Sequence, residues 1–263
     1  MRRILLATFG LLTLLMLCLS QASARDEIRI GVTGTFTGPA AAIGIPYTQA
    51  SELFPTQVAG RPVTWIVLDD GGDPAAAVKN ARRFVDEDQV DAILGSTSPP
   101  GSMAMFDVAT ESKTPQLSLA PVPIPADKRT WLFNVPQAVP IMVSALVDHM
   151  VANKVKTVGF IGFTDSWGDQ NFGALQKLAE AKGIKVVGNE RYNRVDTSVT
   201  AQALKIFSEN PDAVFIGGSA NFTTIARFIG VGERHDFERD DVHLLVGQAR
   251  DVLERGRERR GFG

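Results

Sequence analysis

Two loops of this 263-residue chain carry side chains that could bind a small ligand. Thr97 and Ser98 lie in the segment GSTSPPGS, directly before a helical pattern. Hydroxyl groups at that place favour an anion such as a carboxylate, because the first N–H groups of a helix are free and its positive dipole end lies there. Simple N-capping of the helix is a compatible alternative. Trp167 lies in the segment FTDSWG after an apolar run; it is either a core residue or a stacking wall for a ligand, and its loop position favours the wall.

Covalent catalysis has few candidate residues in this sequence. The imidazoles are His149, His235 and His243, and the single cysteine is Cys18. The segment around Ser98 does not match G-x-S-x-G, and no nearby histidine could serve as its base. A secreted α/β hydrolase therefore stays an alternative that lacks a positioned base, and we assign no catalytic residue.

Two other loops resemble cofactor or metal motifs only in part. Gly31, Gly34 and Gly38 do not have the G-x-G-x-x-G spacing, and no Walker lysine follows them, so we expect a permissive turn and no nucleotide cofactor. The segment DDGGD at 69–73 could supply oxygen ligands to calcium, but the ordered ligand series of a calcium loop is missing. The alternative is a helix cap at Asp73, and we expect no metal.

These loops need a scaffold of parallel strands, and the sequence predicts one. Short apolar runs alternate with segments of helical spacing, which is typical of strands joined by crossover helices. Strands are expected at 28–34, 63–70, 90–95, 115–120, 155–163, 184–188 and 212–218, and helices at 40–58, 73–89, 102–113, 139–153, 167–182 and 197–209. The segment 131–137 is expected to be extended and to cross between two lobes. Because ligands bind beyond the carboxyl ends of such strands, the loops after the strands are where function is expected.

The N-terminus has the pattern of a secretory signal peptide. Arg2 and Arg3 precede an apolar run from Ile4 to Leu19, and Ala22-Ser23-Ala24 is a cleavage pattern. The run is shorter than the roughly twenty residues that a spanning helix needs. We expect Sec export to the periplasm with cleavage after Ala24.

Composition argues against a nucleic-acid partner. The chain has 27 basic and 29 acidic residues, a formal charge of −2, and no basic stripe. With 44% hydrophobic and 21% charged residues it has the profile of a folded globular protein.

The predicted segments, taken in order, resemble a known family. They are IRIGVTGTFTGPAAAIG, VLDDGGDPAAAVKNARRFV, VDAILGSTSPPGSMAM, TPQLSLA, FTDSWGDQNFGALQKLAEAKGIKVV, YNRVDTSVTAQALKI and PDAVFIGGSA. The set, from about 26 to 220, is similar to the leucine/isoleucine/valine-binding proteins, the type I periplasmic substrate-binding proteins of ABC importers. The resemblance implies an α/β fold of two Rossmann-like lobes, each a parallel sheet flanked by helices. Residues 25–137 would form the N-terminal lobe and 138–220 the first part of the second.

The resemblance also implies a set of binding residues. Thr97 and Ser98 match the family's carboxylate-binding loop, and Ala120 to Val122 matches a second strand-end contact. Trp167 stands where the family often has a tyrosine over the ligand, Ile43 where a lid residue can lie, and Ser219 at a strand-end contact of the second lobe. Pro99 and Val122 depart from the family, in which some members have serine and threonine there. An aromatic or other organic acid therefore stays open beside an amino acid.

For function, the resemblance implies a binding protein that catalyses no reaction and needs no cofactor. Its expected partners are a small carboxylate or amino acid and an ABC permease in the inner membrane, with no nucleic acid, and the expected state is a monomer. The sensing domain of a receptor or regulator uses the same fold and stays an alternative.

The last 43 residues depart from the pattern. Residues 221–263 contain eight arginines and no lysine, whereas 25–220 contain eight arginines and nine lysines. We expect this Arg-rich tail to come from a truncated or frameshifted reading frame, which would leave the second lobe incomplete; a natural short variant is the alternative.

Overall fold

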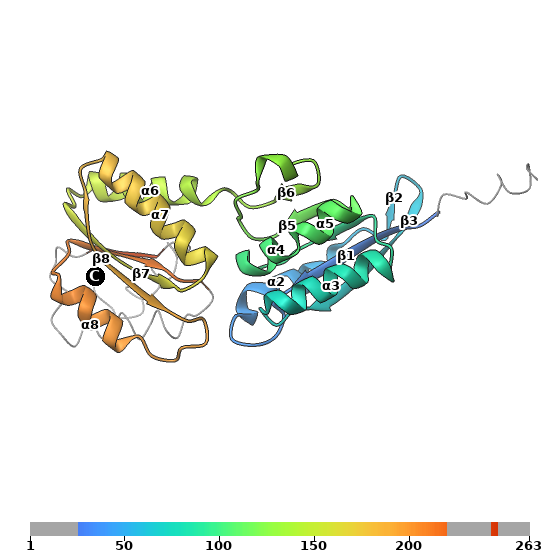
Figure 1. Ribbon diagram of the computed structural model, residues 1–263, viewed down its shortest axis with the longest axis horizontal. Helices are drawn as coiled ribbons and strands as arrows, with labels where there is room; N and C mark the ends of the chain where they lie inside the picture. Colours follow the sequence, from blue (N-terminus) through green and yellow to red (C-terminus); the bar gives the residue numbers. More distant parts are fainter. Residues whose placement is uncertain (1–25, 220–242, 247–263) are drawn as a thin grey trace, which may run out of the picture. The chain divides into compact units, whose positions relative to one another are not determined.

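A computed structural model describes residues 26–219 and 243–246 of the chain (Figure 1). The predicted signal peptide and most of the Arg-rich tail lie outside these residues. The described chain divides into two compact units, a small one with residues 26–28 and 55–64 and a large one with all other described residues. Every binding residue predicted above belongs to the large unit.

The first sheet has six strands in the order β2-β3-β1-β4-β5-β6. The strands are β1 (Ile28–Gly34), β2 (Gln57–Val58), β3 (Arg61–Asp69), β4 (Ala92–Leu94), β5 (Gln116–Ser118) and β6 (Leu132–Asn134). β1, β4, β5 and β6 pair in parallel, whereas β2 and β3 form an antiparallel pair. The segment expected to cross between lobes therefore begins with a strand of this sheet, since Leu132 pairs with Gln116 and Asn134 with Ser118.

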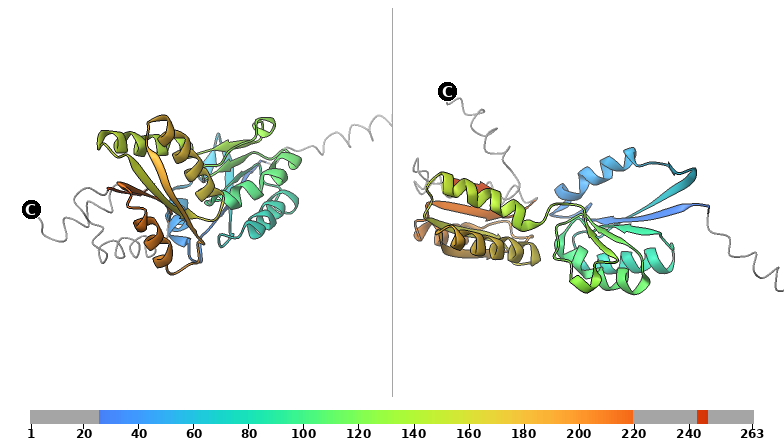
Figure 2. Two further views of the ribbon diagram at one scale, coloured as in Figure 1. Left: turned by 60° about the vertical axis from the view of Figure 1, so that its left-hand side comes forward. Right: turned by 90° about the horizontal axis from the view of Figure 1, so that it is seen from above.

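Helices cover both faces of the first sheet. They are α2 (Ala41–Ala50), α3 (Pro74–Asp86), α4 (Pro99–Ala104) and α5 (Phe106–Ser112), with 3-10 turns at Ser51–Leu53 and Ala126–Lys128. Figure 2 shows α2 on one side of the sheet and the other three helices on the opposite side. Phe84, Ile93 and Met105 are fully buried beneath α3, α4 and α5.

Two predicted helices differ from the observed ones. The helix expected to reach residue 58 ends at Ala50 and continues only as a short 3-10 turn, because Phe54 precedes Pro55 and is held in an extended conformation. The helix expected at 102–113 starts earlier, at Pro99, and divides into α4 and α5. Proline is favoured in a first helical turn, which accounts for the earlier start.

The second sheet has four parallel strands in the order β10-β9-β7-β8. The strands are β7 (Thr157–Phe163), β8 (Lys185–Tyr192), β9 (Ala213–Gly217) and β10 (His243–Val246), and the helices are α6 (Val139–Ala152), α7 (Ser166–Ala181) and α8 (Thr200–Ser208). Figures 1 and 2 show α7 and α8 on opposite sides of this sheet, and α6 packs against α7. All of β9 is buried, and so is all of β7 except Thr157, as expected for strands covered on both faces.

β10 lies in the segment 221–263, for which the sequence predicts a departure from the family pattern. It pairs with β9 in parallel, from His243 opposite Ala213 to Val246 opposite Ile216. The segment therefore contributes one strand to the second sheet.

In each sheet the chain builds outward from one central strand, first to one side and then to the other. β1 lies between β3 and β4, and β7 lies between β8 and β9. At such points the crossover helices leave on opposite faces, so that a crevice opens beyond the carboxyl ends of the strands. The loops that end β1, β4, β7 and β9 are thereby placed where a ligand can bind.

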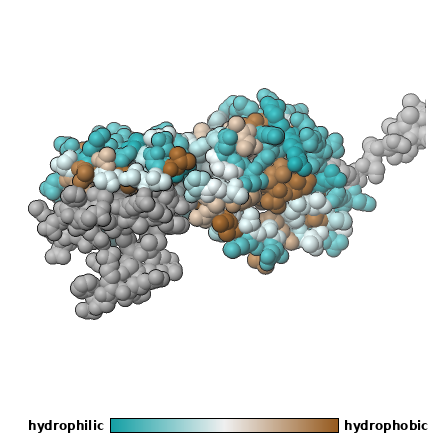
Figure 3. All heavy atoms as spheres, turned by 90° about the horizontal axis from the view of Figure 1, so that it is seen from below, coloured by the Kyte–Doolittle hydropathy of each residue, from teal (hydrophilic) through white to brown (hydrophobic). Residues whose placement is uncertain are grey.

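The face of the molecule drawn in Figure 3 is mostly hydrophilic among the described residues. In Figure 3 a few apolar areas interrupt hydrophilic residues on the face drawn, and exposed large apolar side chains include Leu53, Ile141 and Val195. No helix in the described part of the chain is long and apolar enough to cross a membrane.

Asp212 ties the start of β9 to the start of β7 and provides a pH-dependent test of the second sheet. Its carboxylate accepts hydrogen bonds from the backbone N–H groups of Lys156 (2.7 Å) and Thr157 (2.8 Å). Burial acts to raise the pKa of Asp212, but these hydrogen bonds outweigh it and hold the pKa below its ordinary value of 3.8. Because the pKa is lowered in the folded state, the stabilisation is present above the unfolded pKa and is lost as pH falls through the folded one.

We therefore expect Asp212→Asn to lower the free energy of unfolding by about 1 kcal/mol at pH 7, and by less as the pH is brought below 4. Urea unfolding at pH 7 and at pH 3 measures both values. Glu209→Gln, which removes an exposed carboxylate at the end of α8, is the control and should change neither. An equal loss at both pH values for Asp212→Asn would contradict the proposed role of the charge.

Candidate functional site

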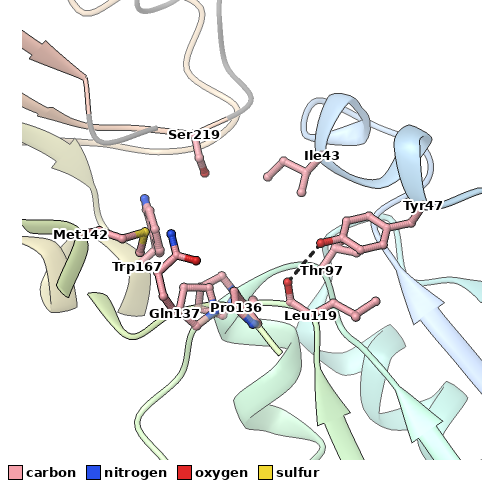
Figure 4. A pocket seen from close by; sticks show the side chains of 12 residues that line it. Ile43, Tyr47, Thr97, Leu119, Pro136, Gln137, Met142, Trp167 and Ser219 are labelled. Atoms are coloured by element: carbon pink, nitrogen blue, oxygen red, sulfur yellow. Dashed lines mark hydrogen bonds between the residues drawn. The ribbon is translucent and has the colours of Figure 1, made fainter. Parts of the chain in front are cut away.

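A pocket of about 150 Å³ lies at the carboxyl ends of the strands, within the large unit (Figure 4). Loops and helices of both sheets contribute to it. Its lining residues are Ile43, Tyr47, Thr97, Pro99, Leu119, Ala120, Pro121, Pro136, Gln137, Met142, Trp167 and Ser219.

Six of the eight predicted binding residues line this pocket. They are Ile43, Thr97, Pro99, Ala120, Trp167 and Ser219. These residues are up to 176 positions apart in the sequence, and the strand order brings them to one place.

The other two, Ser98 and Val122, are not among the lining residues. Ser98 caps α4, with its hydroxyl accepting from the Gly101 N–H at 3.3 Å. Val122 is a core residue, 5% exposed, packed with Phe106 and Leu132. Both backbone groups of Val122 bond to the Asn134 amide, so the structure gives this residue a packing role.

The N-terminus of α4 has no free N–H group, contrary to the expectation for this loop. Its first two residues, Pro99 and Pro100, have no N–H to offer. The next two N–H groups are already bonded, that of Gly101 to the Ser98 hydroxyl and that of Ser102 to the Ser98 carbonyl. An anion in the pocket therefore has no free N–H group at the start of α4 to bind, and side-chain donors become the candidates.

Thr97 is such a donor. Its hydroxyl oxygen accepts a hydrogen bond from the Thr35 N–H at 3.0 Å, and its side chain is almost fully buried. A hydroxyl has one proton to give, and no described group accepts the proton of Thr97. This proton is available to a ligand in the pocket.

The loop that carries Thr97 is held by the buried carboxylate of Asp70, which is 3% exposed. One oxygen of Asp70 accepts from the Ser96 hydroxyl at 2.6 Å. The other accepts from the Thr35 hydroxyl at 3.1 Å and from the Gly72 N–H at 2.9 Å. A single side chain thus joins the loops that follow β1, β3 and β4.

Further buried hydroxyl groups continue this arrangement below α4. Ser102 donates to the Ser96 carbonyl at 2.8 Å, and the Ser118 hydroxyl lies 2.9 Å from that of Ser102. The Gln116 amide donates to the carbonyls of Gly95 (3.1 Å) and Ser102 (2.9 Å). The loop 95–98 is consequently fixed from beneath by groups that do not reach the pocket.

Asp69 and Asp73 bond to backbone N–H groups as well. Asp69 accepts from the N–H groups of Phe36 and Gly71 and from the Thr37 hydroxyl. Burial acts to raise the pKa of Asp69, but these hydrogen bonds outweigh it and lower the pKa. Asp73 caps α3 by accepting from the Ala75 N–H at 2.8 Å, as the helix-cap alternative predicted. No group of three or more metal-binding side chains exists among the residues that the structure describes.

Helix α2 brings Ile43 and Tyr47 to the pocket, and a glycine between them sets its approach. A Cβ on Gly44 would lie 2.0 Å from the Thr35 carbonyl oxygen, so only glycine lets the helix pack this close to the loop after β1. The Tyr47 hydroxyl reaches the Leu119 carbonyl at 3.5 Å (Figure 4).

Trp167 lines the pocket and is also buried, being 3% exposed. Its backbone N–H donates to the Asp165 carboxylate at 2.9 Å, and its carbonyl accepts from the Asn171 amide at 2.8 Å. Asp165 is in turn paired with Arg194 at 2.5 Å. The next residue, Gly168, packs so closely on β7 that a Cβ would lie 1.9 Å from the Phe163 carbonyl oxygen.

The pocket lining is apolar with a few neutral polar groups. Polar groups come from Tyr47, Thr97, Gln137, Ser219 and the Trp167 indole, and none of the twelve lining residues is charged. Such a surface can bind a small apolar body and direct a few hydrogen bonds at its substituents.

Sequence reasoning missed five lining residues: Tyr47, Leu119, Pro136, Gln137 and Met142. A sixth, Pro121, lies within the predicted contact from Ala120 to Val122. Tyr47 follows Ile43 by four positions, and such residues share one face of a helix. Leu119 and Pro121 flank Ala120 after β5. Gln137 and Met142 lie around the start of α6, where the sequence has no pattern that indicates a site.

Comparison with known proteins relates the chain to solute-binding proteins. A family model described as "Periplasmic binding protein" matches residues 27–249. An extracellular ligand-binding receptor from Rhodopseudomonas palustris HaA2 is 49% identical with a TM-score of 0.72, over 73% of this chain and 54% of that chain. A Leu/Ile/Val-binding protein from Rhizobium johnstonii is 24% identical over 206 residues, which are 74% of this chain and 55% of the relative.

A more distant likeness is to a solute-binding protein of an ABC transporter from R. palustris, solved in complex with 4-hydroxybenzoate. It is 22% identical with a TM-score of 0.74, over 84% of this chain and 61% of that chain. The chain spans about half the length of the Leu/Ile/Val-binding relative and of the receptor.

The Asp70 arrangement predicts a stability effect. Asp70→Asn replaces a carboxylate oxygen by an amide donor, so either the Ser96 hydroxyl or the Thr35 hydroxyl and the Gly72 N–H lose their acceptor. We expect a loss of about 2 kcal/mol in the free energy of unfolding, measured by urea denaturation. Asp73→Asn makes the same chemical change at an exposed cap, where asparagine is as good as aspartate, and should be neutral within about 0.5 kcal/mol. Equal stability of the two variants would contradict the role of Asp70.

Proposed function

The chain belongs to the periplasmic binding protein family, and from this we propose that it is the solute-binding component of an ABC importer. It acts in the periplasm, to which the signal peptide 1–24 directs it. It binds a small carboxylate and delivers it to a permease in the inner membrane. Residues 25–137 form its N-terminal lobe, and the second lobe begins at residue 138.

One observation carries this proposal: a single pocket is lined from the strand-end loops of both sheets. A ligand that contacts both sheets can shift the population toward a closed form, because it binds that form more tightly. A permease can then distinguish the loaded protein from the empty one.

The lining favours an organic acid with an apolar body, and an aromatic acid fits it best. Thr97 offers a hydroxyl proton to the carboxylate, while the prolines, Met142 and the Trp167 ring surround the rest. A free amino acid would also bring an ammonium group, and none of the twelve described lining residues is an acid that could pair with it. The distant relative solved with 4-hydroxybenzoate supports the fold alone, so the argument for an aromatic ligand depends on the pocket.

An amino acid is the second candidate, because a Leu/Ile/Val-binding protein is among the relatives. The sensing domain of a receptor would use the same pocket. Genomic neighbours that encode permease and ATPase subunits would favour transport over sensing.

Isothermal titration calorimetry on the chain without the predicted signal peptide, residues 25–263, tests the ligand class. The panel is benzoate, 3- and 4-hydroxybenzoate, leucine and valine. We expect saturable binding of at least one aromatic acid, and no binding or weaker binding of the two amino acids. Tighter binding of leucine than of every aromatic acid would overturn the assignment in favour of the second candidate.

Thr97 supplies a residue-level prediction. Thr97→Val removes the hydroxyl but keeps the shape, and should weaken binding of the carboxylate about tenfold. Thr97→Ser keeps the hydroxyl and should retain most of the affinity. Thermal unfolding of both variants checks that the loop after β4 is intact. Equal affinity of the two variants would show that the Thr97 hydroxyl does not contact the ligand.

A further inference from the structure

The indole nitrogen of Trp167 is a buried hydrogen-bond donor without a partner. Its side chain is 3% exposed and lines the pocket, and Nε1 has no acceptor among the described residues. A buried N–H without an acceptor costs about 1–3 kcal/mol, so most such groups in folded proteins are bonded. The missing acceptor is therefore expected to come from outside the described residues, and a ligand bound in the pocket is one such source.

The surroundings of Trp167 fix its position closely. Asp165 holds its N–H, Asn171 holds its carbonyl, and Gly168 allows α7 to start directly against the end of β7. Arg191 also holds the end of β7 by donating a hydrogen bond to the Phe163 carbonyl at 2.8 Å. The backbone groups of Trp167 are thus satisfied, while Nε1 of its side chain has no acceptor among the described residues.

Position in the pocket makes a ligand the natural acceptor. Trp167 begins the first turn of α7, after the central strand of the second sheet, where the strand order opens a crevice. Figure 4 shows it among Met142, Gln137 and Ser219. Met142 adds an apolar contact, so an oxygen that enters here has the indole N–H as a directed donor.

We propose that the Trp167 indole N–H donates a hydrogen bond to the ligand and selects acids that carry an oxygen acceptor in addition to their carboxylate. Hydroxylated aromatic monocarboxylates are the ligand class that this donor favours over the unsubstituted acids. The inference rests on the proposed function, because it assigns a second contact to the same carboxylate ligand.

The test compares ligands that differ only in this oxygen. Calorimetry is performed on residues 25–263 with benzoate and with its 3- and 4-hydroxy isomers. The wild-type chain should bind at least one hydroxy isomer about tenfold more tightly than benzoate. Trp167→Phe keeps an aromatic wall but removes the N–H, and should reduce this preference to about twofold or less while benzoate binding changes little.

Trp131→Phe is the matched control, since it makes the same chemical change at a residue that does not line the pocket, and it should keep the preference. A wild-type chain without a preference for a hydroxy isomer overturns the inference, and so does a Trp167→Phe chain that keeps it. An equal loss of affinity for benzoate and for both hydroxy isomers overturns it as well, because the Trp167 ring would then contribute only a stacking surface. Absence of binding by any carboxylate to the wild-type chain defeats the proposed function itself, and the inference with it.

A second measurement observes Trp167 in the wild-type chain and does not use the Trp167→Phe variant. The chain has three tryptophans, so a ¹⁵N-labelled sample gives three indole N–H signals, which Trp65→Phe and Trp131→Phe assign by elimination. Binding of a hydroxy isomer should move the Trp167 signal downfield more than benzoate does. Equal shifts with both acids at saturation overturn the inference.

Discussion

The site depends on one buried carboxylate. Asp70 accepts hydrogen bonds from three loops, those after β1, β3 and β4, and it does so without a cationic partner among the bonds described. Burying a charge is costly unless hydrogen bonds satisfy it, and here three donors do so. The position of Thr97 follows from this, because Ser96 and Thr35 are its immediate supports. The positions of the pocket loops therefore depend on the hydrogen bonds that Asp70 accepts.

The fold was largely predictable from the sequence, because hydrophobic periodicity specifies strands and helices locally. The α/β class and the family resemblance are confirmed, and β1 and α3 lie where the pattern placed them. The errors fall where local signals compete. Pro55 ended α2 early, and the adjacent prolines at 99 and 100 opened α4 within a predicted turn. β10 lies in a segment that has no clear strand pattern in the sequence.

The binding residues were less predictable, since a pocket is a property of the folded chain. Loop position identified Thr97 and Trp167, and resemblance added Ile43, Ala120 and Ser219; whether they bind a ligand stays a prediction. Ser98 and Val122 do not line the pocket, because a cap and a core contact occupy the same loops as the pocket residues. The unpartnered nitrogen of Trp167 has no sequence signal at all, because only burial in three dimensions makes an N–H costly.

The two prolines that open α4 also bear on which anions the pocket rejects. Phosphate and sulfate are usually held by several converging N–H groups at a helix start, and Pro99 and Pro100 remove the first two such groups here. Single hydroxyl and indole donors suit a carboxylate, which needs few contacts, but they leave most oxygens of a tetrahedral anion unsatisfied. Inorganic phosphate and sulfate would thus compete poorly for the pocket with the proposed organic acid.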